Sequence, residues 1–142
     1  MLMRDLLIST TANRIQHLTG VLGVAEECAF NDDNYTSDFL EDKTSALLIH
    51  TTQGDFNFGV QLYLFNTDDA ALDAMLISVS KHGIAVAQPN ESSDSPFDYV
   101  LFLDGEKQDC EIDTDEIFDE VFVINPKHVR KTLRALQADT TA

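Results

Sequence analysis

The clearest pattern in the chain is a pair of runs rich in β-branched and aromatic residues, at 46–51 and 56–65. They flank the turn-forming sequence Thr-Gln-Gly-Asp at 52–55, so the sequence predicts a β-hairpin. In the second run, large apolar residues alternate with Asn57, Gly59, Gln61 and Tyr63. One face of this strand is therefore expected to pack and the other to be mostly polar.

A helical repeat recurs near the N-terminus, where apolar or small positions fall at Leu7, Thr11, Ile15, Leu18 and Leu22. Gly20 and Gly23 supply stop signals, so a first helix is predicted here. The alternative is that residues 8–11 form a short strand followed by a helix N-cap, because Ser and Thr serve well as caps.

Two further helices have start signals. Thr67 is the expected N-cap of a helix that begins with two aspartates and closes at Lys81-His82-Gly83. Its apolar stripe comprises Leu72, Met75, Leu76 and Val79. Asn125 and Pro126 predict the start of a terminal helix whose inward residues are Val129, Leu133 and Leu136.

Shorter apolar runs predict the remaining strands, at 24–30, 84–87, 99–103, 110–113 and 117–124. Turn-forming residues predict loops at 31–38 and 88–96, and Asp104-Gly105 predicts a tight turn. The order of elements indicates an α+β fold with an antiparallel-rich sheet and two or three helices packed on one face. A length of 142 residues suits a single compact domain spanning residues 1–142.

Charge is the main compositional bias, since 25 acidic residues against 9 basic ones give a net charge of -16. Residues 91–125 alone hold twelve acidic groups and only Lys107 as a base. The terminal helix is basic through Lys127, Arg130, Lys131 and Arg134. Nucleic acid and anionic membranes are unfavourable partners for such a chain, and a cationic partner is favoured.

Within the acidic segment, strand alternation places Asp109, Glu111 and Asp113 on one face, and Cys110 and Ile112 on the other. We call these three carboxylates the acidic ladder. Neighbouring members would lie about 6.6–6.8 Å apart and repel by roughly 0.6 kcal/mol per pair in water. The same patch is extended by Asp115, Glu116, Asp119 and Glu120. Repulsion without benefit to the fold indicates recognition, although a solvated charged face is the competing interpretation.

Known catalytic patterns are missing from the sequence. The histidines show no zinc spacing, two acidic segments fail the calcium-loop pattern, and no glycine-rich nucleotide motif is present. Cys28 and Cys110 lack CxxC partners and are expected to be reduced, buried thiols. We therefore expect no metal and no cofactor, and a protein that is not an enzyme.

These features favour a cytoplasmic, acidic protein-binding module, and above all an inhibitor or immunity-type protein that neutralises a basic partner such as a nuclease toxin. It would act as a nucleic-acid mimic through the acidic ladder and its extension. The alternative is a regulatory or assembly module that binds through the sheet face of Asn57, Gln61 and Tyr63, with acidity serving solubility. A small enzyme is the third hypothesis. A second acidic cluster comprises Glu26, Glu27, Asp32, Asp33, Asp38, Glu41 and Asp42.

Overall fold

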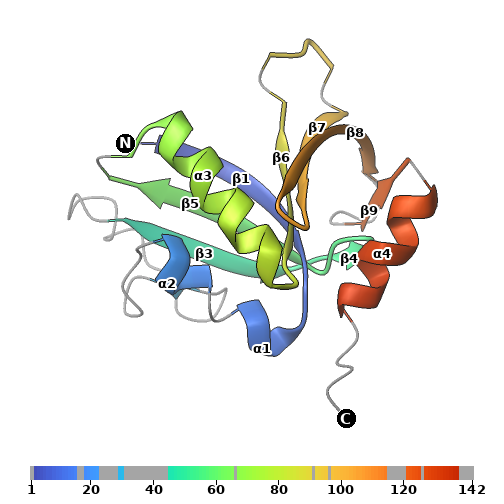
Figure 1. The fold of residues 1–142 in the computed structure, drawn as a ribbon, viewed down its shortest axis with the longest axis horizontal. Helices are drawn as coiled ribbons and strands as arrows, with labels where there is room; N and C mark the ends of the chain where they lie inside the picture. The colour runs from blue at the N-terminus through green and yellow to red at the C-terminus, as the bar shows by residue number, and fades with distance from the viewer. Residues whose placement is uncertain are drawn as a thin grey trace.

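A strongly curved, mostly antiparallel β-sheet dominates the computed structural model (Figure 1). The structure describes residues 2–15, 18–22, 29–30, 45–65, 67–90, 92–95, 97–114, 121–125 and 127–137. The described strands are β1 (Leu2–Ser9), β2 (Ala29–Phe30), β3 (Ala46–Thr51), β4 (Gln53–Gly54), β5 (Phe58–Leu64), β6 (Ala85–Pro89), β7 (Asp98–Leu103), β8 (Glu106–Thr114) and β9 (Val121–Ile124). The described helices are α1 (Ala12–Ile15), α2 (Leu18–Leu22), α3 (Asp69–Val79), the 3-10 turn η3 (Ser80–His82) and α4 (Lys127–Gln137).

The sheet curls back on itself toward a barrel. Its strand order is β2-β3-β5-β1-β6-β7-β8-β9-β4, so β4 lies at the far end although it sits between β3 and β5 in the chain. The tip of the β3–β5 hairpin reaches across to β9, where Gln53 and Gly54 pair in parallel with Val121 and Phe122. The predicted hairpin is confirmed, because β3 and β5 pair antiparallel, and its tip also closes the sheet.

Two apolar clusters lie on opposite faces of this sheet. Leu6 and Ile8 of β1 belong to the first, which includes Leu72, Leu76 and Val79 of α3. Leu7 belongs to the second, with Val129 and Leu133 of α4. Figure 1 shows α3 lying across β1 and β5, and α4 beside β9. The mixed α and β character is confirmed, whereas the prediction that the helices share one face is not, because the central strands carry apolar residues on both faces.

The N-terminal helix prediction is wrong over its first part. Residues 2–9 form β1, which pairs with both β5 and β6, and Leu6, Leu7 and Ile8 are all buried. A strand covered on both faces carries a continuous apolar run, which periodicity alone does not distinguish from a helix. The alternative of a strand followed by a cap is closer, since the hydroxyl of Thr11 accepts a hydrogen bond from the Arg14 N–H at 3.2 Å.

The other described elements follow the sequence closely. The cap of α3 is Asp68 rather than Thr67, because the Asp68 carboxylate accepts a hydrogen bond from the Ala71 N–H at 2.8 Å. The predicted tight turn is confirmed, with φ of 52° at Asp104 and 83° at Gly105. Of the strand predicted at 24–30 only β2 is described, and the loop at 31–38 lies outside the described residues. Among the described helices, none has the length and apolarity needed to cross a membrane.

Candidate functional site

The acidic ladder has the alternation that the sequence predicts. Asp109, Glu111 and Asp113 are exposed on β8, whereas Ile112 is fully buried and Cys110 is partly buried. The pairing of β8 with β7 fixes this orientation, because Cys110 lies opposite Tyr99 and faces the second apolar cluster. The ladder therefore points away from that cluster, toward solvent.

A fourth carboxylate faces the ladder from the neighbouring strand. Asp98 of β7 lies directly opposite Glu111 of β8, and like charges in this position destabilise a sheet. The Asp98 carboxylate accepts a hydrogen bond from the Ser93 hydroxyl, and Glu111 accepts one from the Asn125 amide at 2.7 Å. Both hydrogen-bond donors are neutral, so neither cancels the charge.

Nearby cations are paired elsewhere. Lys107, on β8 itself, binds Asp73 of α3 with 2.8 Å between Nζ and Oδ2, and Arg4 pairs with Asp69. Both ion pairs line a pocket of about 200 Å³ beside the start of α3. Within the described ranges, no ion pair reaches Asp98 or the acidic ladder.

The predicted binding patch extends beyond the residues that the structure describes. Asp115, Glu116, Asp119 and Glu120 lie outside the described residues, as do Cys28 and the second acidic cluster over residues 26–42. The structure therefore adds Asp98 to the candidate site and brings it together with the three ladder residues. Sequence alternation could have placed Asp98 on one face of β7, but the strand register that puts it opposite Glu111 was needed to find it.

Cys110 lies beneath the ladder in a setting that disfavours its thiolate. Partial burial, together with the negative charges of Asp109 and Asp98, raises the pKa of Cys110 to about 12, and burial is the largest of these causes. Burial likewise raises the pKa of Tyr99, with further contributions from Asp5 and Cys110. Cys110 is a free cysteine, as expected, but it is partly rather than fully buried, and its slow reaction stays a prediction.

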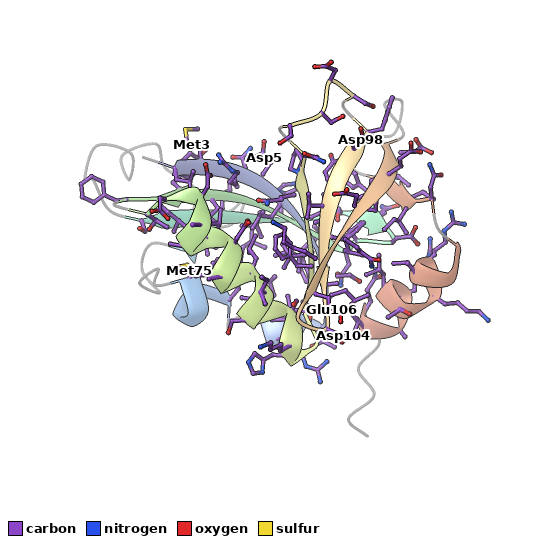
Figure 2. The ribbon with its side chains drawn as sticks, turned by 45° about the horizontal axis from the view of Figure 1, so that its top comes forward. Met3, Asp5, Met75, Asp98, Asp104 and Glu106 are labelled. Carbon is purple, nitrogen blue, oxygen red and sulfur yellow. The ribbon has the colours of Figure 1, made fainter. Side chains whose placement is uncertain are left out.

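A second surface lies on the side of the sheet away from α3. Met3 is 58% exposed there, and Figure 2 shows Met3 and Asp5 projecting together from β1 on this side. With Gln61 and Tyr63 they line a shallow pocket of about 260 Å³. Asn57, which the sequence placed on the same face, instead uses its amide to bond Thr10 at 3.1 and 2.6 Å.

A buried polar cluster, missed by the sequence analysis, joins α4 to the sheet. The Asp55 carboxylate is fully buried, and one oxygen accepts a hydrogen bond from the Ile124 N–H at 2.8 Å. The Nε of Arg134 lies 2.7 Å from its other oxygen, and the Nε of Arg130 lies 3.3 Å from the first. Sequence reasoning assigned Asp55 to a turn and the arginines to a basic surface. The cluster has a structural role, since it ties the hairpin tip to β9 and α4.

Comparisons with protein-family models, with curated proteins and with solved structures return no match to this chain. Among the described residues, no group of three or more His, Cys, Asp or Glu side chains is arranged to hold a metal ion. Two surfaces, the acidic ladder and the pocket beside Met3, are the candidate functional sites among the described residues.

Self-repulsion across the acidic surface gives a prediction about salt. Raising sodium chloride from low to moderate concentration should increase the melting temperature by about 4 °C, because screening removes roughly 1 kcal/mol of repulsion. Differential scanning calorimetry measures this shift. The Asp98→Asn variant, which removes the charge opposite Glu111, is the control and should show a smaller shift. A flat or falling dependence in the unmodified protein would contradict a destabilising acidic surface.

Proposed function

We propose that this protein is an acidic protein-binding module of the inhibitor or immunity type, which neutralises a basic partner such as a nuclease toxin. The observation that carries the proposal is the acidic ladder with Asp98 opposite it. These carboxylates are exposed or half-exposed, lie on two paired strands and have no ion-pair partner among the described residues.

Charge complementarity supplies the mechanism. A row of carboxylates on a rigid strand imitates the spaced negative charges of a nucleic-acid backbone, so it would occupy the basic groove that binds phosphate. Such complementarity accelerates association and opposes binding to acidic proteins. Like charges on paired strands cost the sheet stability, and one neutral hydrogen bond each to Asp98 and Glu111 is the return described for it, so recognition accounts for the ladder better than stability does.

The first test is to neutralise the ladder. The Asp109→Asn, Glu111→Gln, Asp113→Asn variant should fold as stably as the unmodified protein or slightly more so, because repulsion is removed. As bait in affinity purification from the native cell, the unmodified protein should capture a basic protein that the variant loses. At low ionic strength the variant should associate with that partner at least tenfold more slowly, and salt should affect its association less.

A matched control separates the ladder from total charge. Asp94, Asp104 and Glu106 are exposed acidic residues outside the ladder, and Figure 2 shows Asp104 and Glu106 at the opposite end of the β7–β8 hairpin from Asp98. The Asp94→Asn, Asp104→Asn, Glu106→Gln variant changes net charge equally and should keep most of the association rate. Equal rates for all three proteins would refute a role for the ladder.

A second function is favoured by the pocket beside Met3. Exposed Met3, together with Gln61 and Tyr63 and the pocket of about 260 Å³, provides an apolar and polar surface suited to a regulatory or assembly module. In that function the acidity serves solubility. Capture of the same acidic or neutral protein by the unmodified bait and by the ladder variant would favour this function over the first.

A further inference from the structure

One edge of β8 has outward-pointing backbone groups beside the acidic ladder. The Ile112 N–H donates to Phe97 O at 2.9 Å, so residue 112 turns its backbone groups toward β7. In antiparallel pairs this orientation alternates from one residue to the next. Residues 106, 108 and 110 therefore also turn their N–H and C=O groups toward β7. The Asn90 N–H donates to Asp98 O at 2.9 Å, which turns residue 98 toward β6 and agrees with this register. Lys107 and Asp109 therefore direct their N–H and C=O groups away from β7.

The far edge of β8 is paired only at its end. Strand β9 pairs with Ile112, Asp113 and Thr114, and the Asn125 N–H donates to Glu111 O at 2.9 Å. After Asn125, the segment that paired with β8 turns away from it and continues into α4, which packs against β1 and β9. In the part of the chain that the structure describes, no strand pairs with the outward groups of Lys107 and Asp109. Among the described residues, this edge continues the line of β9 with no strand beside it, as strand addition requires.

The charges beside this edge select which strand fits. Lys107 is held by Asp73, so the charges at or next to the open segment without an ion-pair partner among the described residues are those of Glu106, Asp109 and Glu111. A strand that carries a basic residue opposite Asp109 would meet this negative charge. We propose that residues 107–110 of β8 receive an extended basic segment of the partner as an added strand, an inference that rests on the proposed function.

The test uses a defined probe, a short peptide of alternating lysine and valine. It should bind the full-length protein in titration calorimetry, and the backbone amides of Lys107 and Asp109 should become protected from hydrogen exchange. The same peptide with alternate backbone amides N-methylated keeps its charge and loses the ability to pair. It should bind at least tenfold more weakly. Equal affinity of the two peptides would overturn strand addition.

A pair of variants tests the same point from the protein's side. Asp109→Asn and Asp109→Pro remove the same charge, but only proline also removes the outward N–H, and it spares every hydrogen bond to β7. Asp109→Pro should bind the peptide about tenfold more weakly than Asp109→Asn. Gln108→Pro, whose N–H points toward β7, should destabilise the protein instead. If Asp109→Pro does not fold, the two peptides still decide the question.

The outcomes distinguish this inference from the proposed function. If neutralising the ladder weakens peptide binding but N-methylation does not, charge recognition stands and strand addition is overturned. If N-methylation weakens binding but neutralising the ladder does not, the edge accepts strands and the proposed electrostatic function fails. Failure of the peptide to bind at all, or dimerisation of the protein that protects the same two amides, would overturn the basic strand as the occupant.

Discussion

Replacing Asp55 with alanine is expected to lower the free energy of unfolding by about 3–5 kcal/mol, the cost of removing one partner from a buried ionic cluster. The carboxylate is fully buried and holds the Ile124 N–H, Arg130 and Arg134. Its loss leaves a buried N–H without an acceptor and opens a cavity at the hairpin tip. Because both arginines are partly exposed and can turn to water, the lower end of this range is expected. Urea unfolding followed by circular dichroism measures it.

The arginines provide the controls. The Arg134 side chain is 56% exposed, so Arg134→Ala should cost less than about 1 kcal/mol even though its Nε lies 2.7 Å from Asp55. A double-mutant cycle between these positions separates the ion pair from the hydrogen bond to Ile124. If Asp55→Ala unfolds at the same urea concentration as the unmodified protein, the carboxylate does not hold the hairpin tip to β9 and α4. If the only effect is faster hydrogen exchange of the α4 amides, the carboxylate contributes to the local docking of α4 alone.

The Asp55 cluster also marks where sequence reasoning reaches its limit. Asp55 follows Gly54 between two strands, a setting that is typical of a solvent-exposed turn. Its burial depends on β4 reaching β9, a contact between segments almost seventy positions apart in the chain. No local pattern encodes that contact. The sequence did show that Arg130 and Arg134 share one face of a helix, because they are four residues apart, but it did not show which carboxylate they contact.

Strands with one exposed face were predicted well. The alternation in β8 placed Ile112 inside and the acidic ladder outside, and β5 alternates in the same way. Strand β1 was not predicted, because its apolar run is buried on both faces and carries no two-residue period. The reason is physical. A periodic pattern of apolar residues arises when an element has one buried face and one solvent-exposed face, whereas the central strand of this curved sheet is buried on both faces.

The candidate site likewise has features that strand alternation predicts and features that depend on the fold. Strand alternation alone predicted the exposure of Asp109, Glu111 and Asp113. The opposition of Asp98 and Glu111, the capture of Lys107 by Asp73 and the open edge of β8 all depend on strand register and on α3. Strand register determines which charged side chains lie opposite one another. The charge pairing at the site could therefore be derived only from the folded structure.

Cys110 is expected to react with iodoacetamide at pH 8 roughly 30- to 60-fold more slowly than an unperturbed thiol. A pKa of about 12 in place of 9.0 lowers the thiolate fraction about a thousandfold. The greater nucleophilicity of a more basic thiolate restores about 16- to 32-fold of this loss. Partial burial slows the reaction further. The measurement is mass spectrometry of a Cys28→Ser variant, so that one thiol is followed, with the same variant in guanidinium chloride as the reference for an unperturbed thiol.

The sign of the electrostatic contribution can be tested at the same residue. Carboxylates disfavour a nearby thiolate, so Asp109→Asn and Asp98→Asn should each lower the pKa of Cys110 and accelerate alkylation. Neither should restore the reference rate, because burial is the largest cause of the shift. In every folded variant the rate should rise about tenfold per pH unit from pH 7 to 10, since thiolate remains the minor species. A plateau below pH 10, or alkylation as fast as in guanidinium chloride, would show that the thiol is neither shielded by β7 nor influenced by the ladder.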